Sequence, residues 1–308
     1  MRTSFVKALT ELAANDKSIN LITGDLGFGV LEDYSRRFPL QFLNAGVAEQ
    51  NMTGLATGMA LSGKTVFTYS IGNFPTLRCL EQIRNDICYH RANVKIVCVG
   101  GGFAYGPLGI SHHATEDLAI MRSLPNMTVV APGDPIESEA ATRACAYLQG
   151  PCYLRLGKSG EPRIHKEPIE FQIGRSIEVR RGSDLCIFTT GGILPVAVQV
   201  ADDLEKLGIG ARVLSFHTVK PIDKQAIIAG ARETRLVVTM EEHSVIGGLG
   251  GAVAEVLGEI PEAHAPVKRI GIPDTFSSEV GSQGYLRNFY GLSPDRARAS
   301  IQAWLGKT

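Results

Sequence analysis

The chain has 308 residues, of which 44% are hydrophobic and 20% charged, and 31 basic side chains balance 31 acidic ones. This indicates a globular protein with room for two domains, and the neutral balance gives no reason to expect nucleic acid or an anionic membrane as a partner. We expect a cytoplasmic protein, because no signal peptide or membrane span is visible and six cysteines are scattered without a CxxC pair.

The first half of the chain alternates short apolar runs with helical patterns. It opens with an amphipathic helix over residues 1–17, with Phe5, Leu9 and Leu12 on one side. Strands are predicted at Ile19–Thr23, Val66–Tyr69, Val94–Val99, Met127–Ala131 and Cys152–Leu156. The predicted helices are Ala48–Leu61, Thr76–Tyr89, Thr115–Ser123 and Pro135–Leu148, the last capped by Asp134.

A break in this pattern separates two halves. Residues 161–183 contain prolines, mixed charges and no hydrophobic period, which is typical of a linker. The predicted α/β class has two domains, 1–160 and 184–308, each a mainly parallel sheet covered by helices. The second has strands at Leu185–Thr189, Ala211–Phe216, Arg235–Met240 and Val267–Gly271, and helices at Leu194–Leu207, Asp223–Ala231, Leu249–Leu257 and Pro294–Leu305, the last capped by Ser293.

The stretch FLNAGVAEQNMTGLATGMA, residues 42–60, combines small residues with a single acid, Glu49. One helical face, or nearly so, carries Val47, Leu55 and Met59. This pattern predicts a helix that packs tightly against another part of the structure. A glutamate is almost never buried unless it is paired. Glu49 is therefore either an acid that the helix dipole stabilises or a functional group.

A phosphate-loop pattern, GxxxxGK[ST], also occurs at Gly58, Gly63, Lys64 and Thr65. A true phosphate loop runs from strand to loop to helix, so that amides at the helix start face the phosphates. Here the predicted helix comes first and the strand second. We interpret the match as a helix-ending turn with glycine in the left-handed conformation. No GxGxxG spacing supports a nicotinamide dehydrogenase either.

The segment FLNAGVAEQNM resembles the thiamine-diphosphate signature of the transketolase family's pyrimidine-binding domain. The resemblance implies that Glu49 hydrogen-bonds the ring nitrogen of the cofactor's aminopyrimidine and so helps to activate the cofactor by acid–base chemistry. It also implies that an aromatic residue after the Val66–Tyr69 strand stacks on this ring. Phe74 is the first choice and Tyr69 the second, and Asp25 matches a residue close to the cofactor.

The segment SHHATEDLA resembles the family's THQ segment, which implies that His112 contacts the oxygen atoms of the substrate and that His113 is only a neighbour. By the same resemblance, Arg155 and Arg2 bind a sugar phosphate, and Lys158 is a weaker candidate. The chain departs from the family pattern where it has three consecutive glycines, Leu108 and Gly29 in place of polar side chains (Gly100, Gly101, Gly102).

The resemblance runs nearly end to end, but the family's diphosphate-binding domain has no counterpart here. It implies the C-terminal subunit of a split transketolase, with the cofactor shared with an N-terminal subunit that holds Mg²⁺, in a heterotetramer or a self-dimer. The implied reaction transfers a two-carbon ketol unit between sugars or sugar phosphates. Alternatives are a beta-type subunit of a 2-oxo acid dehydrogenase, a deoxyxylulose-phosphate-synthase-like enzyme and a non-catalytic scaffold subunit.

Overall fold

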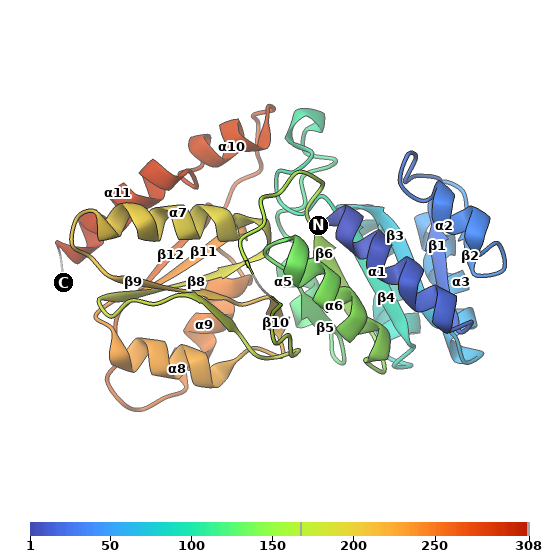
Figure 1. Ribbon diagram of the computed structural model, residues 1–308, viewed down its shortest axis with the longest axis horizontal. Helices are drawn as coiled ribbons and strands as arrows, with labels where there is room; N and C mark the ends of the chain where they lie inside the picture. Colours follow the sequence, from blue (N-terminus) through green and yellow to red (C-terminus); the bar gives the residue numbers. More distant parts are fainter. Residues whose placement is uncertain (167, 307–308) are drawn as a thin grey trace.

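Two sheets lie side by side in the computed structural model of the chain, which describes residues 1–166 and 168–306 (Figure 1). The first sheet has seven strands in the order β10-β5-β6-β4-β3-β1-β2, and the second has five in the order β12-β11-β8-β9-β7. All strand pairs are parallel except β10–β5 and β7–β9. The predicted α/β class with two mainly parallel sheets is confirmed.

The inner strands of the first sheet are buried on both faces, which explains their continuous apolar runs. The strands are β1 (Ile19–Thr23), β2 (Phe42–Asn44), β3 (Thr65–Ile71), β4 (Val94–Val99), β5 (Thr128–Val130) and β6 (Cys152–Leu156). One face packs against α1 (Arg2–Asn15) and α6 (Pro135–Tyr147), and the other against α3 (Glu49–Leu61) and α5 (Asp117–Ser123). A short α2 (Glu32–Arg37) precedes β2.

The predicted helix at Thr76–Tyr89 is not a regular α-helix. It consists of a 3₁₀ turn η1 (Leu77–Cys79), a single α turn α4 (Leu80–Gln82) and a π-helix η2 (Ile83–Cys88). Another 3₁₀ turn, η3 (Gly106–Leu108), follows β4. Such π segments are often found near functional sites.

The second sheet is covered by helices on both faces as well. Its strands are β7 (Ile177–Arg180), β8 (Leu185–Thr190), β9 (Ala211–Ser215), β11 (Val237–Ser244) and β12 (Val267–Ile272). The 3₁₀ turn η4 (Gly191–Ile193) leads into α7 (Leu194–Glu205), which covers one face with α10 (Gln283–Phe289) and α11 (Pro294–Leu305). The other face packs against α8 (Lys224–Glu233) and α9 (Leu249–Gly258).

One predicted cap is wrong. Ser293 precedes α11 as expected, but its side chain makes no capping bond and its hydroxyl donates to Asn288 Oδ1 at 2.9 Å.

None of the helices in the described part of the chain has the length and hydropathy needed to cross a bilayer.

Three short strands were missed (β2, β7 and β10), because segments of three or four residues carry no readable period. β10 (Thr218–Lys220) comes from the second half of the chain but pairs antiparallel with β5 of the first sheet, with Thr218 opposite Val130. β7 lies inside the segment expected as a linker and pairs with β9. The expected division of the chain at residues 160 and 184 stays a prediction.

The start of α6 ties the linker to the first domain. Asp134 caps α6 as predicted, since its Oδ1 accepts the amides of Ile136 and Glu137 at 2.9 and 2.8 Å. Its Oδ2 accepts the amides of Ile164 and His165, each at 2.9 Å. The carboxylate of Glu137 and Nε2 of His165 lie 2.8 Å apart and are buried.

This ion pair predicts a pH dependence of stability. Burial alone would raise the pKa of Glu137, but the hydrogen bond from His165 and other donors bring it below the ordinary value of 4.5. Burial alone would lower the pKa of His165, but Glu137 raises it above the ordinary value of 6.5. The stabilisation from Glu137 is lost as the pH falls through its lowered pKa, and that from His165 is lost as the pH rises through its raised pKa.

We therefore expect His165→Ala to reduce the free energy of unfolding most between pH 4.5 and 6.5, and less on either side. Urea unfolding from pH 4 to pH 9 measures this. His90→Ala, at an exposed histidine, is the matched control and should give a small, flat difference. A loss in His165→Ala that does not vary with pH would contradict the coupling.

Candidate active site

Glu49 lies where β2 gives way to α3, at the carboxyl end of the first sheet. Its side chain is only 3% exposed and packs against the end of β1, where a Cβ added to Gly24 would lie 3.6 Å from Glu49 Cγ. Nη1 of Arg78 donates to Oε2 of Glu49 at 3.2 Å. The buried carboxylate is thus paired, as such groups must be, and Arg78 itself is 52% exposed.

A row of contacts leads away from this carboxylate. The Arg78 guanidinium lies over the ring of Phe74, with Cζ 4.4 Å from the ring centroid. Phe74 meets the ring of His112 edge to face, with centroids 5.1 Å apart. The His112 and Tyr105 rings follow at 6.2 Å. We call Glu49, Arg78, Phe74, His112 and Tyr105 the active-site row.

His112 is suited to proton transfer. Burial, followed by the nearby charges of His113 and Arg78, lowers the pKa of His112 below 6.5, so the ring is neutral at neutral pH. A neutral imidazole both accepts and donates a hydrogen bond, and its Nδ1 lies 3.0 Å from Oγ of Ser111. His113 is buried, with its Nε2 3.1 Å from the carbonyl oxygen of Gly106.

Lys158 and Arg2, two cationic residues predicted for the site, lie close to Tyr105. Tyr105 itself was not predicted from the sequence. Nζ of Lys158 lies 5.0 Å from the centroid of the Tyr105 ring. Burial raises the pKa of Tyr105, and the charge of Arg2 opposes that rise, so Arg2 lies near the hydroxyl. The run of three glycines just before Tyr105 was the available signal, and in the structure a Cβ on Gly100 would come within 2.2 Å of the Tyr105 ring.

The other two glycines of this run are also required by packing. A Cβ on Gly101 would lie 2.7 Å from Arg155 Nε, and one on Gly102 would lie 2.7 Å from the carboxylate of Glu242. At residues 100–102 the neighbouring side chains therefore leave no room for larger residues, and Tyr105 occupies the space beside Gly100. Leu108 is 55% exposed, and nothing lies within 4 Å of a Cβ built on Gly29.

Arg155 is not part of the row. Its guanidinium is 4% exposed and donates from Nε to Oδ2 of Asp117 at 2.7 Å and from Nη2 to the carbonyl oxygen of Ala114 at 2.8 Å. The residue expected to hold a sugar phosphate is thus engaged in an internal ion pair. Lys158, the weaker candidate, is the exposed cation beside Tyr105.

Tyr69 lies on the other face of the sheet from Glu49. It stacks on Phe5 of α1 with ring centroids 6.0 Å apart and is 1% exposed. The alternation of side chains along β3 places Phe67 and Tyr69 in this core. Of the two aromatic candidates, only Phe74 therefore lies beside Glu49.

Asp25 follows β1 in the left-handed conformation, with a φ of 56°. Nδ2 of Asn44 donates to its Oδ1 at 2.9 Å, and Oδ1 of Asn44 accepts the amides of Asp25 and Gly46, each at 3.0 Å. Asn44, which was not predicted, thereby holds together the loop after β1 and the loop after β2, beside Glu49. Its place at the carboxyl end of a short strand was the available signal.

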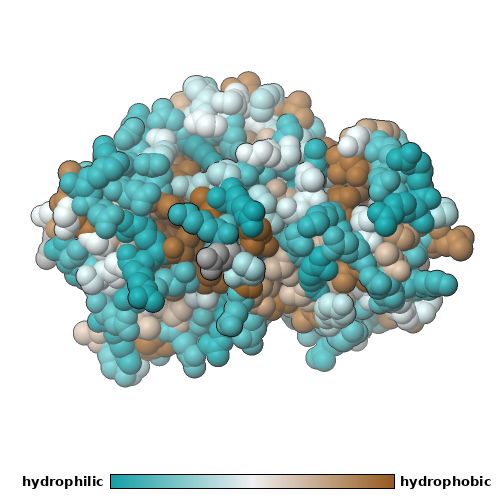
Figure 2. Space-filling model, in the orientation of Figure 1, coloured by the Kyte–Doolittle hydropathy of each residue, from teal (hydrophilic) through white to brown (hydrophobic). Residues whose placement is uncertain are grey.

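Of the predicted packing face of α3, Met59 is half-buried against the core, whereas the expectation is wrong for Val47 and Leu55 in the chain on its own. The buried residues are Met52, Thr53, Ala56 and Thr57 besides Glu49, whereas Val47 is 74% and Leu55 39% exposed. Nothing lies within 4 Å of a Cβ on Gly54 or Gly58. Figure 2 shows further apolar side chains at the surface of the end of the molecule where α2, β2 and α3 lie.

The row fits one end of an aminopyrimidine cofactor. The guanidinium of Arg78 is a planar N–H donor that lies on Phe74 and donates to Glu49, so the pair can hold a planar, hydrogen-bonding ring. The described residues do not offer a comparable site for a metal ion. Among residues 1–166 and 168–306, no group of three or more His, Cys, Asp or Glu side chains could hold a metal ion.

Comparisons with known proteins identify the family of the chain. The family described as "Transketolase, pyrimidine binding domain" matches residues 1–162, and "Transketolase, C-terminal domain" matches residues 174–296. An apulose-4-phosphate transketolase subunit of Phocaeicola vulgatus is 40% identical over 275 residues, 89% of this chain and 87% of the relative.

Two further relatives extend the likeness. The 6-deoxy-6-sulfo-D-fructose transketolase subunit of a Clostridium species is 39% identical over 294 residues, 95% of this chain and 90% of the relative. A solved structure described as "Split gene transketolase, inactive beta4 tetramer" superimposes with a TM-score of 0.87 at 40% identity, covering 98% of this chain and 96% of the other. The chain therefore belongs to the transketolase family, with the family's pyrimidine-binding and C-terminal domains in one polypeptide.

Proposed function

We propose that this chain is the C-terminal subunit of a thiamine-diphosphate-dependent split transketolase that transfers a two-carbon ketol unit between sugars or sugar phosphates. The observation that carries the proposal is the placement of Arg78. Its planar guanidinium lies on Phe74 while donating to a buried Glu49. These are the two contacts that an aminopyrimidine needs, so Arg78 has to move aside when the cofactor enters.

When bound, thiamine diphosphate supplies the nucleophilic carbon that attacks a ketose carbonyl. Glu49 holds a proton on its carboxyl group for a ring nitrogen, which is general acid–base work. Phe74 offers the aromatic face on which a planar ring stacks. His112, neutral at neutral pH, moves a proton to or from a substrate oxygen.

Arg2 and Lys158 favour a substrate with an anionic end. Both cations lie around Tyr105 at the far end of the active-site row from Glu49. A phosphate or another anionic group on the sugar would meet them there. The named relatives act on apulose 4-phosphate and 6-deoxy-6-sulfo-D-fructose, two anionic sugars, which supports this class of substrate.

The cofactor's diphosphate and its Mg²⁺ are assigned to an N-terminal partner subunit with a diphosphate-binding domain. The open face of α3, with Val47, Leu55, Gly54 and Gly58, gives such a partner or a second copy of this chain a surface to cover. The assembly we propose is a heterotetramer or a self-dimer. Because the cysteines of the described chain are free and buried, we place the reaction in the reducing cytosol.

Calorimetry tests the proposal. We expect thiamine diphosphate with Mg²⁺ to bind a mixture of this chain and its N-terminal partner, and to bind this chain alone at least about 100-fold more weakly, because the diphosphate contacts are missing. The same mixture should then transfer ketol units from ketose phosphates. A mixture that forms a complex but binds no cofactor would overturn the proposal in favour of a scaffold subunit, and decarboxylation of 2-oxo acids without ketol transfer would favour a 2-oxo acid dehydrogenase.

A further inference from the structure

A closed loop of the first domain carries two members of the active-site row, Tyr105 and His112. The backbones of Gly102 and Ala114 exchange two hydrogen bonds, of 2.8 and 3.0 Å, so the chain between them is pinched into a loop with a fixed stem. We call residues 103–113 the His112 loop. The place of His112 therefore depends on what holds this stem.

The second domain holds both ends of the His112 loop through the carboxyl end of β11. Oε1 of Glu242 accepts the amide of Phe103, the first residue of the loop, at 2.7 Å. The amide of Ser244 donates to the carbonyl oxygen of Thr115, just beyond the other end, at 2.8 Å. Between these two, Nε2 of His243 accepts an amide in the first turn of α5 at 3.3 Å. Three consecutive residues of one strand thus span the stem.

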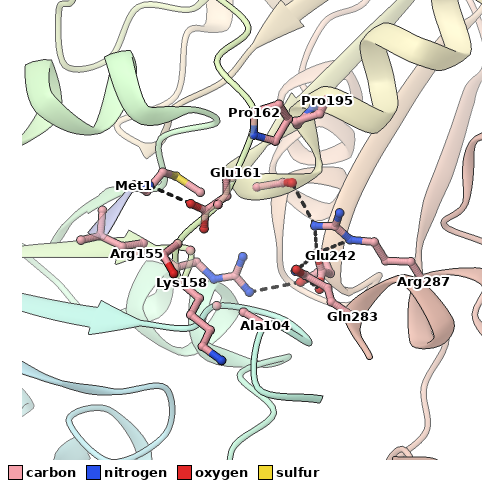
Figure 3. Close-up of a pocket in the computed structure, with 17 residues that line it drawn as sticks. Met1, Ala104, Arg155, Lys158, Glu161, Pro162, Pro195, Glu242, Gln283 and Arg287 are labelled. Atoms are coloured by element: carbon pink, nitrogen blue, oxygen red, sulfur yellow. Dashed lines mark hydrogen bonds and ion pairs between the residues drawn. The ribbon is translucent and has the colours of Figure 1, made fainter. Parts of the chain in front are cut away.

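The carboxylate of Glu242 is itself held in place. It is 3% exposed and lines a cavity between the two domains, where Figure 3 shows Gln283 and Arg287 converging on it. Nε2 of Gln283 donates to Oε1 at 2.9 Å, and Nε of Arg287 donates to Oε2 at 2.8 Å. Because both oxygens are fixed in this way, the amide of Phe103 meets an acceptor at a set position.

Phe103 connects this acceptor to the residue beside His112. Its ring is fully buried and stacks on Tyr290, just after α10 of the second domain, with centroids 5.4 Å apart. The same ring meets the ring of His113 edge to face, with centroids 5.1 Å apart. The second domain therefore contacts both the amide and the ring of a residue that packs against the neighbour of His112.

We propose that Glu242 is a positioning residue that acts across the domain boundary, and that by holding the amide of Phe103 it sets the place of His112. This inference rests on the proposed function, in which His112 moves a proton at a substrate oxygen. All members of the active-site row come from the first domain. The contact from Glu242 gives the C-terminal domain a part in the reaction.

Glu242→Ala removes the acceptor of the Phe103 amide. In the reconstituted two-subunit enzyme we expect kcat/KM to fall by about 10- to 10²-fold, because displacing a reacting group by about 1 Å has an effect of this size. Urea unfolding of the same variant shows whether the chain is still folded.

The titration of His112 is a second readout, which a merely structural role of Glu242 would not move. Histidine NMR signals of the full chain give its pKa, and His112→Gln assigns the signal. Burial is the largest cause that lowers this pKa, so a loosened loop should raise it toward 6.5. The substitution leaves unchanged the other groups that face the ring (Phe74, Arg78, Tyr105, Ser111 and His113).

Three further variants separate the bond to Phe103 from the rest of the cluster. Gln283→Ala, the matched control, removes a donor to the same carboxylate but leaves that bond, so kcat/KM should stay within about twofold and the pKa of His112 should not change. Glu242→Gln keeps an acceptor oxygen for the amide and should recover most of the lost rate. Tyr290→Ala removes the half-buried ring that stacks on Phe103 and should raise the pKa of His112 even if Glu242→Ala does not fold.

A folded Glu242→Ala chain in which His112 titrates as before would refute the proposal, and so would equal losses of rate in Glu242→Ala and Gln283→Ala. A raised pKa of His112 with unchanged turnover would support the positioning and count against His112 in the chemistry. If the unmodified enzyme transfers no ketol unit, the proposed function fails, but the titration in the chain alone still tests whether Glu242 positions His112.

Discussion

Replacing Glu49 with alanine should lower the turnover of the reconstituted two-subunit enzyme by about 10²-fold or more, the usual contribution of a positioned acid–base group. The fold should survive, because the partner of Glu49, Arg78, is 52% exposed and is not left as an unpaired buried charge. Initial rates at saturating thiamine diphosphate measure the effect, and calorimetry shows whether cofactor affinity falls with it.

Glu81→Ala is the matched control. Glu81 is an exposed carboxylate in α4, on the same loop-rich segment as Arg78, and lies outside the active-site row. Its removal should leave turnover within about twofold of the unmodified enzyme, as for surface positions in general. Near-normal turnover in Glu49→Ala would show that Glu49 takes no part in catalysis and only packs at the start of α3.

The largest expected loss of stability follows from Asp117. This carboxylate is fully buried and accepts from Nε of Arg155 at 2.7 Å and from the hydroxyl of Tyr153 at 2.5 Å. Burial alone would raise the pKa of Asp117, but Arg155 brings it below its ordinary value. Asp117→Ala leaves a buried guanidinium without its partner, and we expect the free energy of unfolding to fall by about 3–5 kcal/mol.

Urea unfolding at neutral pH measures this loss. The control is Asp33→Ala, which removes a surface carboxylate that pairs with Arg36 and Arg37, each at 3.6 Å. Exposed pairs of this kind contribute about 0–1 kcal/mol. Asp117→Asn keeps the shape but not the charge, so a loss close to that of alanine assigns the effect to the ion pair. Equal, small losses in Asp117→Ala and Asp33→Ala would show that the buried pair is not needed.

The sequence was enough for the longer strands of both sheets and for the place of Glu49, because both depend on local pattern. Buried parallel strands appear as continuous apolar runs, and a lone acid stands out among small residues. The partner of Glu49 was not predictable in this way. Arg78 is 29 residues further along the chain and reaches Glu49 only through the irregular backbone of η1 to η2.

Arg155 shows the limit of reasoning from position along a strand. The rule that ligands meet the carboxyl ends of parallel strands gave the position of Arg155 correctly. The rule does not show whether another side chain of the protein already pairs with the residue at that position. Asp117, 38 residues earlier, pairs with the guanidinium.

For Tyr69, the alternation of side chains along β3 could be seen in the sequence. Which face of the sheet packs against α1 and which against α3 became clear only from the assembled fold.

The strand β10 has a consequence for how the two domains can be handled. A fragment that stops before Thr218 would leave the outer edge of β5 without the strand that pairs with it. An open edge of this kind is a site for self-association with other strands. Side chains cross between the halves as well, since Phe103 packs in the core of the second sheet and Val219 in a core of the first, so the two domains interlock. The domains are therefore poor candidates for separate expression or for exchange between relatives as independent modules.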